Sequence, residues 1–178
     1  FTLQEKEMGP LTLEGALRFE KSNIKASSIG YDRSFNAFSG AGGFSYALAD
    51  GIKASISVSH SERAPSAEEL LSDGPHAATQ TFERGNPDFD KETSWGGEAS
   101  LKFNRDGYSV ALTGYASWFD GFIYESDTGL IEDDLPLFQF LQDKARTSGF
   151  EFEAAAPIAQ IAGFNIVGAV TADMTRAK

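Results

Sequence analysis

The residues best suited to chemistry lie in one polar segment, residues 61–92, which contains three prolines and interrupts a regular alternation of apolar and polar residues. His76 lies in this segment, with Asp73 and Glu83 nearby and Asp88 a little further on. A neutral imidazole with one or two carboxylates is a sound ligand set for Zn²⁺. The sequence therefore predicts His76, Asp73 and Glu83 as metal ligands. Because a lone loop histidine is more often simply exposed to solvent, that alternative stays open.

Two further groups of ionisable residues could serve a metal ion. Glu132, Asp133 and Asp134 form a run in a second polar segment. Such a run is usually a solvated loop tip, and recruitment of cations is the alternative function. His60 alternates with the residues of its strand so that its side chain is expected to face outward, near the end of that strand. We therefore interpret it as a residue at the membrane interface, with metal binding as the less favoured role.

Catalytic motifs are missing from the sequence. There is no Gly-x-Ser-x-Gly nucleophile elbow, and the glycines within residues 40–43 are not followed by a helix that could hold a phosphate. Two histidines in 178 residues leave few candidates for a catalytic base. Ser66 suggests a structural role instead, because Glu69 follows at the spacing of a capping box and predicts a short helix over residues 67–71. We therefore expect no enzymatic activity and no bound cofactor.

Charge and composition narrow the class of protein. With 26 acidic and 15 basic residues the formal net charge is −11, which predicts repulsion of nucleic acid and of anionic lipid headgroups. The chain has no cysteine, so disulfides and thiolate metal sites are excluded. No run approaches the roughly 18 consecutive apolar residues that a membrane helix needs. A membrane β-barrel stays open, because its strands need only about 9–11 residues each.

Most of the chain alternates between apolar and polar residues with the period of a β-strand. Strands are expected at about residues 11–20, 37–48, 52–59, 94–103, 108–118, 138–153 and 161–173, after a strand tail at residues 1–6. One face of these strands is apolar and includes Leu13, Val58, Leu101 and Leu112. The other face carries charges at mid-strand, namely Glu14, Arg18, Lys53, Glu98 and Glu151. A dry core would not tolerate such charges, but a water-filled lumen would.

The connections are expected to alternate in length. Short turns are expected at residues 7–10, 49–51, 104–107 and 155–159, and long loops at residues 23–36, 61–92 and 125–136. Large aromatic residues of the apolar face lie beside both sets of connections, as at the two interfaces of a bilayer: Tyr46, Phe103, Tyr108, Phe38, Trp95 and Trp118. These features predict an all-β fold, a fragment of about seven strands from an antiparallel up-and-down transmembrane β-barrel. The alternative is a soluble β-sandwich or lipocalin-like barrel with the apolar face inside.

Several motifs resemble the barrel region of TonB-dependent outer-membrane receptors. They are Arg63-Ala-Pro-Ser-Ala-Glu-Glu-Leu70, Gly85-Asn86-Pro87 with Lys91-Glu92, Trp118-Phe-Asp-Gly-Phe-Ile-Tyr124 and Ala145-Arg-x-x-Gly-Phe-Glu151. Residues 73–83 and 131–134 are most similar to the zinc-uptake type of these receptors. The resemblance implies a barrel of about 22 strands, occluded by an N-terminal plug domain. Residues 1–178 are then an internal part of the barrel, and the plug and the final strands are expected to lie outside this sequence.

The resemblance also implies a location and a function. The location is the outer membrane of Gram-negative bacteria, and the function is energy-dependent uptake of a scarce nutrient, with Zn²⁺ or another metal ion as the first expected cargo and an iron–siderophore complex as the second. The expected partners are outer-membrane lipid, the metal ion or metal chelate, and the TonB energy-coupling complex acting through the plug. An isolated fragment exposes two strand edges, through which we expect self-association. The competing class is a soluble β-rich binding module, for example for a carbohydrate.

Overall fold

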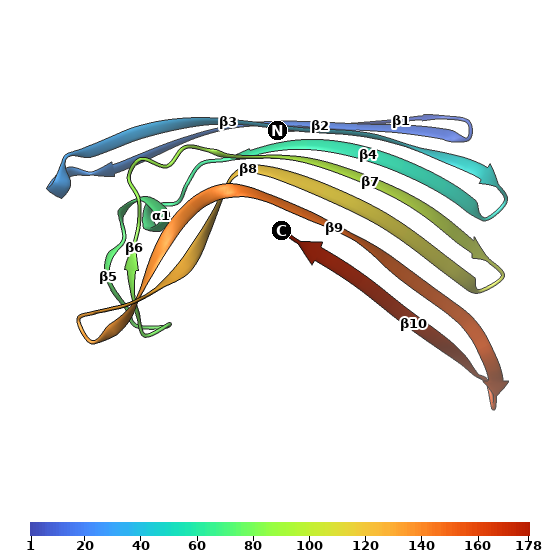
Figure 1. The fold of residues 1–178 in the computed structure, drawn as a ribbon. Helices are drawn as coiled ribbons and strands as arrows, with labels where there is room; N and C mark the ends of the chain where they lie inside the picture. The colour runs from blue at the N-terminus through green and yellow to red at the C-terminus, as the bar shows by residue number, and fades with distance from the viewer.

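The alternating residues form ten strands that hydrogen-bond into one curved sheet (Figure 1). The structure, a computed structural model, describes residues 1–178. Its elements are β1 Thr2–Met8, β2 Leu11–Ala26, η1 Ser27–Ile29, β3 Tyr31–Ala49, β4 Ile52–Arg63, α1 Ala67–Leu71, β5 Asp73–His76, β6 Thr81–Arg84, β7 Glu92–Arg105, β8 Tyr108–Glu132, β9 Leu135–Ile161 and β10 Phe164–Ala177. The sheet runs β1-β2-β3-β4-β7-β8-β9, and β9 then pairs with β10 along its later part and with β6 near its start. None of the helical segments has the length and apolar character that a membrane crossing would require.

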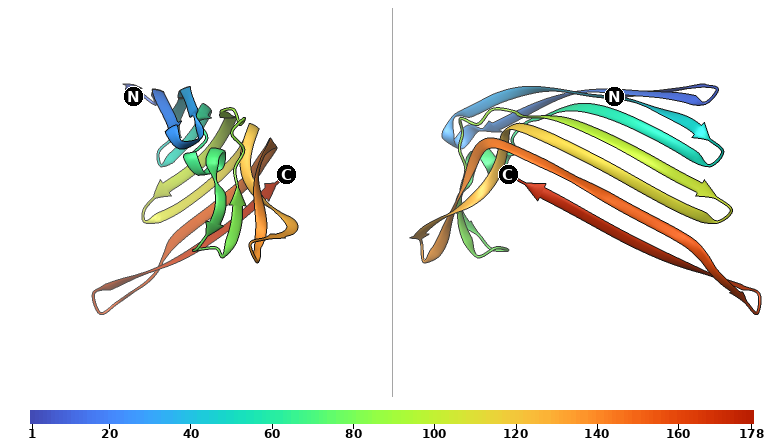
Figure 2. Two further views of the ribbon diagram at one scale, coloured as in Figure 1. Left: turned by 90° about the vertical axis from the view of Figure 1, so that its left-hand side faces the viewer. Right: turned by 45° about the vertical axis from the view of Figure 1, so that its right-hand side comes forward.

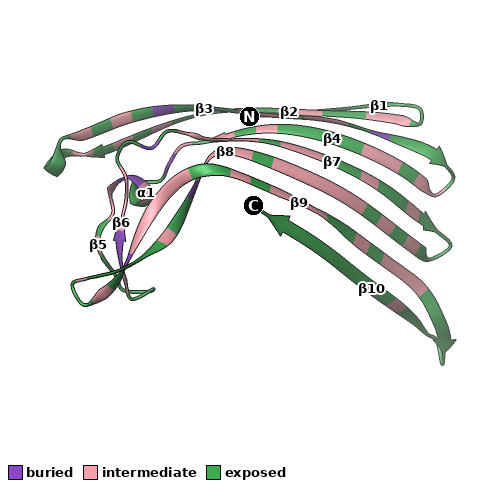
Figure 3. Ribbon diagram, viewed as in Figure 1, coloured by how far each residue is buried: buried purple, intermediate pink, exposed green.

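The strand register brings the expected apolar residues onto one continuous face, which we call the outer face. Leu13 pairs with Phe44, and Leu101 pairs with Leu112. These side chains are open rather than packed, with exposed fractions of 41% for Leu13, 56% for Val58, 48% for Leu101 and 49% for Leu112. Figure 3 shows the long strands as exposed or intermediate over most of their length. The soluble alternative, which requires these residues in a sealed interior, is therefore wrong.

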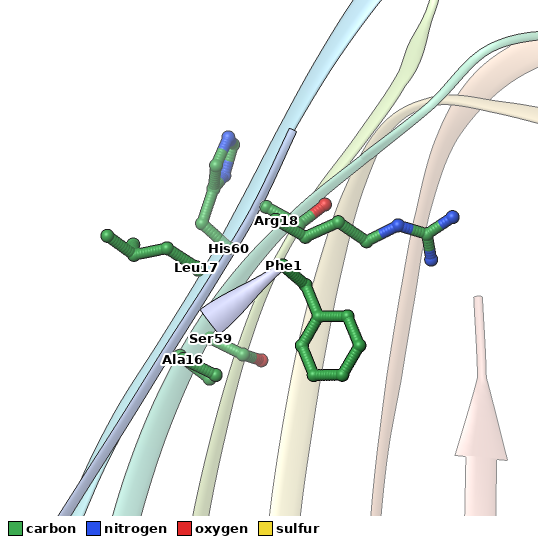
Figure 4. A pocket seen from close by; sticks show the side chains of 9 residues that line it. Phe1, Ala16, Leu17, Arg18, Ser59 and His60 are labelled. Carbon is green, nitrogen blue, oxygen red and sulfur yellow. The ribbon is translucent and has the colours of Figure 1, made fainter. Parts of the chain in front are cut away.

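The opposite, inner face carries the polar and charged residues. Lys53 and Lys102, for example, are direct partners across β4 and β7. Figure 4 shows the division of the faces close to the start of the chain, where Leu17 and His60 project to one side of the sheet and Arg18 projects to the other. The open hollow in that view, about 440 Å³ in volume, is lined from both faces and gathers no set of ligating side chains.

Tight turns join the strands at one end of the sheet (Figure 2). Three of them lie where they were expected and use glycines with positive φ, namely Gly9 at 62°, Gly51 at 75° and Gly107 at 84°. The fourth differs, because residues 155–159 continue β9 and the chain reverses at Ala162–Gly163. Pro157, which suggested a turn, is tolerated within the strand because the pairing with β10 shifts register at that point. A bulge accommodates the missing N–H donor of a proline.

At the opposite end, two of the three expected loops are strands. β2 and β3 continue through residues 23–36 and reverse over η1 and Gly30. β8 and β9 continue through residues 125–136 and reverse at Asp133–Asp134, with φ values of 50° and 63°. Both expected loops are therefore wrong, and the sheet has ten strands where about seven were expected. A strand with water on both faces can be polar on both, which removes the alternation that identifies it.

The remaining connection, residues 64–91 between β4 and β7, folds into a structured unit that we call the cap. Its helix α1 begins with the predicted capping box: Glu69 N–H donates to Ser66 Oγ at 3.1 Å, and Ser66 N–H donates to the Glu69 carboxylate at 2.7 Å. Strand β6 of the cap adds parallel to β9. A buried hydrophobic cluster joins the cap to the strands beside it: Phe35, Leu70, Phe89 and Ile123. The cap therefore lies at the end of the sheet opposite the tight turns, fixed by its own small core.

Candidate functional site

The β5–β6 hairpin of the cap divides the three predicted metal ligands between its two faces. Its register pairs Asp73 with Arg84 and His76 with Thr81. Because side chains alternate along a strand and direct partners share a face, His76 and Glu83 project from one face and Asp73 from the other. The structure therefore brings His76 and Glu83 together and places Asp73 apart from them.

His76 and Glu83 form a close pair on their face of the hairpin. The Nδ1 atom of His76 lies 2.7 Å from Glu83 Oε1 and 3.1 Å from Thr79 Oγ1. The hydroxyl oxygens of Thr79 and Thr81 lie 3.3 and 3.4 Å from the same carboxylate oxygen. The His76 side chain is 50% exposed, whereas that of Glu83 is only 11% exposed. The Glu83 carboxylate and the Thr79 hydroxyl thus both lie at Nδ1, and Nε2 is the ring nitrogen without a hydrogen-bond partner.

Asp73 takes part in a different cluster, centred on Arg84. The Arg84 guanidinium binds both carboxylate oxygens of Glu132, at 2.7 and 2.8 Å, and lies 3.4 Å from Asp73 Oδ1. The hydrogen bonds to Glu132 are the largest cause of the raised pKa of Arg84. This contact, from the Nη2 atom of Arg84 to both carboxylate oxygens, ties β6 to the end of β8, so Asp73 and Glu132 are neutralised by an arginine rather than free to bind a cation.

Glu125 is a second acidic residue near His76, besides Glu83, and it was not among the predicted site residues. It lies on β8 and shares the face of Ile123, which packs into the cluster beneath the cap. Partial burial of the carboxyl group is the largest cause of its raised pKa although the residue as a whole is exposed, and repulsion from Glu83 adds to the shift. The electrostatic effect of His76 lowers the pKa of Glu125 and so opposes this shift. Extending the alternation of β8 beyond residue 124 would have placed Glu125 on this face.

No complete metal site is assembled within residues 1–178. Nowhere do three or more histidine or acidic side chains converge where one metal ion could bind. The predicted acidic run is also divided, since Glu132 is held by Arg84, whereas Asp133 and Asp134 form an exposed turn. His76 thus remains a candidate ligand, because its side chain is half exposed and its Nε2 atom has no hydrogen-bond partner.

His60 lies on the outer face, as its parity indicated. Its ring lies against Trp95, tilted by 39° with 4.7 Å between the ring centroids, and Trp95 pairs with Trp118 across β7 and β8. Its Nε2 atom lies 3.8 Å from Glu62 Oε1, and its Nδ1 atom is buried without a partner. The tryptophans beside it on an exposed apolar face are typical of a membrane interface.

The curved open sheet, its apolar outer face and its polar inner face define a section of a transmembrane β-barrel. Residues 3–177 match the family described as TonB dependent receptor-like, beta-barrel, and the chain belongs to this family. The expected fold class is therefore confirmed.

Solved structures of the same fold include three with high structural similarity. The siderophore receptor PirA from Pseudomonas aeruginosa gives a TM-score of 0.70 at 18% identity over 97% of this chain and 33% of its own. The copper transporter OprC gives 0.70 at 20% identity over 96% and 27%. The hemophore receptor HasR of Serratia marcescens gives 0.63 at 17% identity over 83% and 29%. The chain thus spans about a third or less of the length of these proteins.

Proposed function

We propose that this chain is part of an outer-membrane receptor that takes up a scarce nutrient with energy supplied by a TonB-type complex. Proteins of this family are outer-membrane proteins of Gram-negative bacteria. The exposed apolar outer face supports contact of this chain with lipid, and the polar inner face supports an aqueous or plugged lumen. The energy-coupling complex would act through a plug domain that belongs to the receptor outside residues 1–178. The receptor would then act as a transporter and not as an enzyme.

We infer that the cargo is a metal ion, with Zn²⁺ first. The observation that carries this inference is the His76–Glu83 pair, in which a carboxylate oxygen lies 2.7 Å from Nδ1 and Nε2 has no hydrogen-bond partner. A carboxylate on one ring nitrogen orients the imidazole and makes the other nitrogen a better metal ligand. Glu83 therefore acts as the positioning residue, and His76 as the ligand. A tetrahedral site needs further ligands, which water or other parts of the receptor would supply.

Zinc titration of the full-length receptor tests this assignment. His76→Ala is expected to weaken zinc binding, and His60→Ala is the matched control because it removes the other histidine from a face that points away from the lumen. Calorimetry at neutral pH measures both affinities. Equal zinc affinity in the wild-type receptor and in His76→Ala would remove His76 from the site.

An iron–siderophore complex is the second candidate cargo. It is supported by the structural likeness to receptors whose names include siderophore and enterobactin. Receptors for anionic chelates are expected to present basic and aromatic loops, whereas this chain has a net charge of −11 and an exposed Asp133–Asp134 turn at the capped end. Binding of a ferric catecholate with no measurable binding of free Zn²⁺ would favour this alternative over the metal ion.

A further inference from the structure

A group of basic residues lies on the outer face at the capped end of β9 and β10. Along β9, Lys144 and Arg146 share the parity of Phe150, whose partner on β10 is Met174. Arg176 pairs with Ser148, and the backbone of Lys178 exchanges hydrogen bonds with Arg146 at 2.8 and 2.9 Å. Alternation therefore puts four positive charges on the lipid-facing side of two adjacent strands. We call Lys144, Arg146, Arg176 and Lys178 the outer basic patch.

The outer basic patch lies at the level of the aromatic residues that mark the membrane interface. Trp118 is the direct partner of Arg146 across β8 and β9, and the Arg146 guanidinium lies 5.3 Å from the centroid of the Trp118 ring. Trp118 in turn pairs with Trp95. Tryptophans on a lipid-facing surface occupy the headgroup region, so the adjacent basic side chains reach the same depth.

No carboxylate within residues 1–178 pairs with these basic residues. None of the four forms an ion pair there, although all five of the other arginines do, at carboxylates such as Glu69 and Glu132. Arg146 and Lys178 are directly opposite each other, and like charges in that position destabilise a sheet, so an anion bound between them would relieve the repulsion. Asp120 has the same outer parity, as the partner of Thr93, but its carboxylate pairs with none of the four. The patch therefore gathers four positive charges that no carboxylate of residues 1–178 neutralises, in a chain whose net charge is −11.

We propose that the outer basic patch binds the phosphate groups of an anionic lipid in the leaflet at the capped end of the barrel. Arginine and lysine are the side chains that bind phosphate best, and two basic residues on neighbouring strands can share one phosphate group. The lipid chains would lie along the exposed apolar outer face below the patch. Each basic residue near an anionic membrane surface is worth about 1 kcal/mol, which corresponds to about fivefold in affinity.

Lipid binding to the full-length receptor in detergent tests the proposal. The probes are lipid A with its two phosphates and the same lipid after phosphatase treatment, each followed by native mass spectrometry. The double variant Arg146→Gln, Arg176→Gln removes two charges of the patch. The matched control, Lys53→Gln with Lys102→Gln, removes two charges from neighbouring strands on the inner face. The patch variant is expected to weaken binding of the phosphorylated lipid about 25-fold, from two factors of about five, and to leave the dephosphorylated lipid unchanged.

Three results would overturn the proposal. The first is equal loss for the phosphorylated and dephosphorylated lipids, because the patch would then act through apolar packing. The second is an equal effect of the inner-face control, because the cause would then be net charge alone. The third is a change in oligomeric state in place of lipid release, which would assign the patch to contact with another copy. Unfolding temperatures of both variants, measured by circular dichroism, show that the compared proteins are equally folded.

Discussion

Replacing Glu83 by glutamine tests the role assigned to the His76–Glu83 pair. Glutamine has nearly the same shape and keeps an oxygen that can accept from Nδ1, 2.7 Å away, but it removes the negative charge that strengthens this contact. Loss of such a partner typically costs about 10- to 100-fold in metal affinity, or about 1.4–2.8 kcal/mol. Because the His76 side chain is 50% exposed and water can replace part of the interaction, we expect about 10-fold.

The assay is zinc calorimetry of the full-length receptor, with Asp73→Asn as the control. Asp73 is a carboxylate on the same hairpin, but it faces Arg84 and is 72% exposed, so its replacement is expected to leave zinc affinity unchanged. Two results would refute the reasoning: full affinity in Glu83→Gln, or a loss in Asp73→Asn as large as that in Glu83→Gln. The second result would mean that net charge in the cap matters, rather than the orientation of His76.

Three further predictions concern the cap and are measured by hydrogen exchange in the full-length receptor. Leu70→Ala, at a position only 1% exposed, is expected to lower the opening free energy of α1 by about 2–5 kcal/mol, with Leu130→Ala, at an exposed position, as the silent control. Arg84→Gln removes the charged contact with Glu132 and is expected to speed exchange in β6 but not in α1; unchanged β6 protection would show that the contact does not hold the hairpin. Glu125 lies on β8 beside the cap and has a raised pKa, so the folded protein binds its proton more readily than the unfolded chain does, and protection of the cap is expected to fall as pH rises from the ordinary glutamate range through the raised pKa. Glu125→Gln should remove that fall, and a fall that persists in the variant would assign it to another group.

The membrane-facing part of the fold could be predicted from the sequence because two different solvents act on the two sides of each strand. Lipid selects Leu101 and Leu112 on one side, and water selects Glu98 on the other, so the alternation is strict there. Beyond the bilayer, as in residues 23–36, water meets both sides and the pattern disappears. The strands continue nonetheless because the backbone hydrogen bonds of the ladder do not depend on side-chain polarity.

The metal ligands could be predicted only in part, for a related reason. Asp73, His76 and Glu83 were grouped because they are close in the sequence. Once residues 73–84 form a hairpin, the alternation of side chains between its two faces determines which of the three lie together. Arg84 was also overlooked as a competitor, although a basic residue directly opposite Asp73 neutralises it. A hairpin register was needed to see both effects, and the prolines and glycines of the segment gave no single register in advance.

Net charge shows most clearly what a composition cannot reveal. A net charge of −11 predicts repulsion from anionic lipid only if positive and negative charges are mixed evenly over the surface. The strand register separates them instead: Glu98 and Glu151 lie on the inner face, whereas Arg146 and Arg176 lie on the outer face. A membrane enforces this separation, because charge on the outer face is tolerated only at the depth of the headgroups. The position of the basic residues beside Trp118 is therefore a consequence of the bilayer, and lipid phosphate is the anion available at that depth.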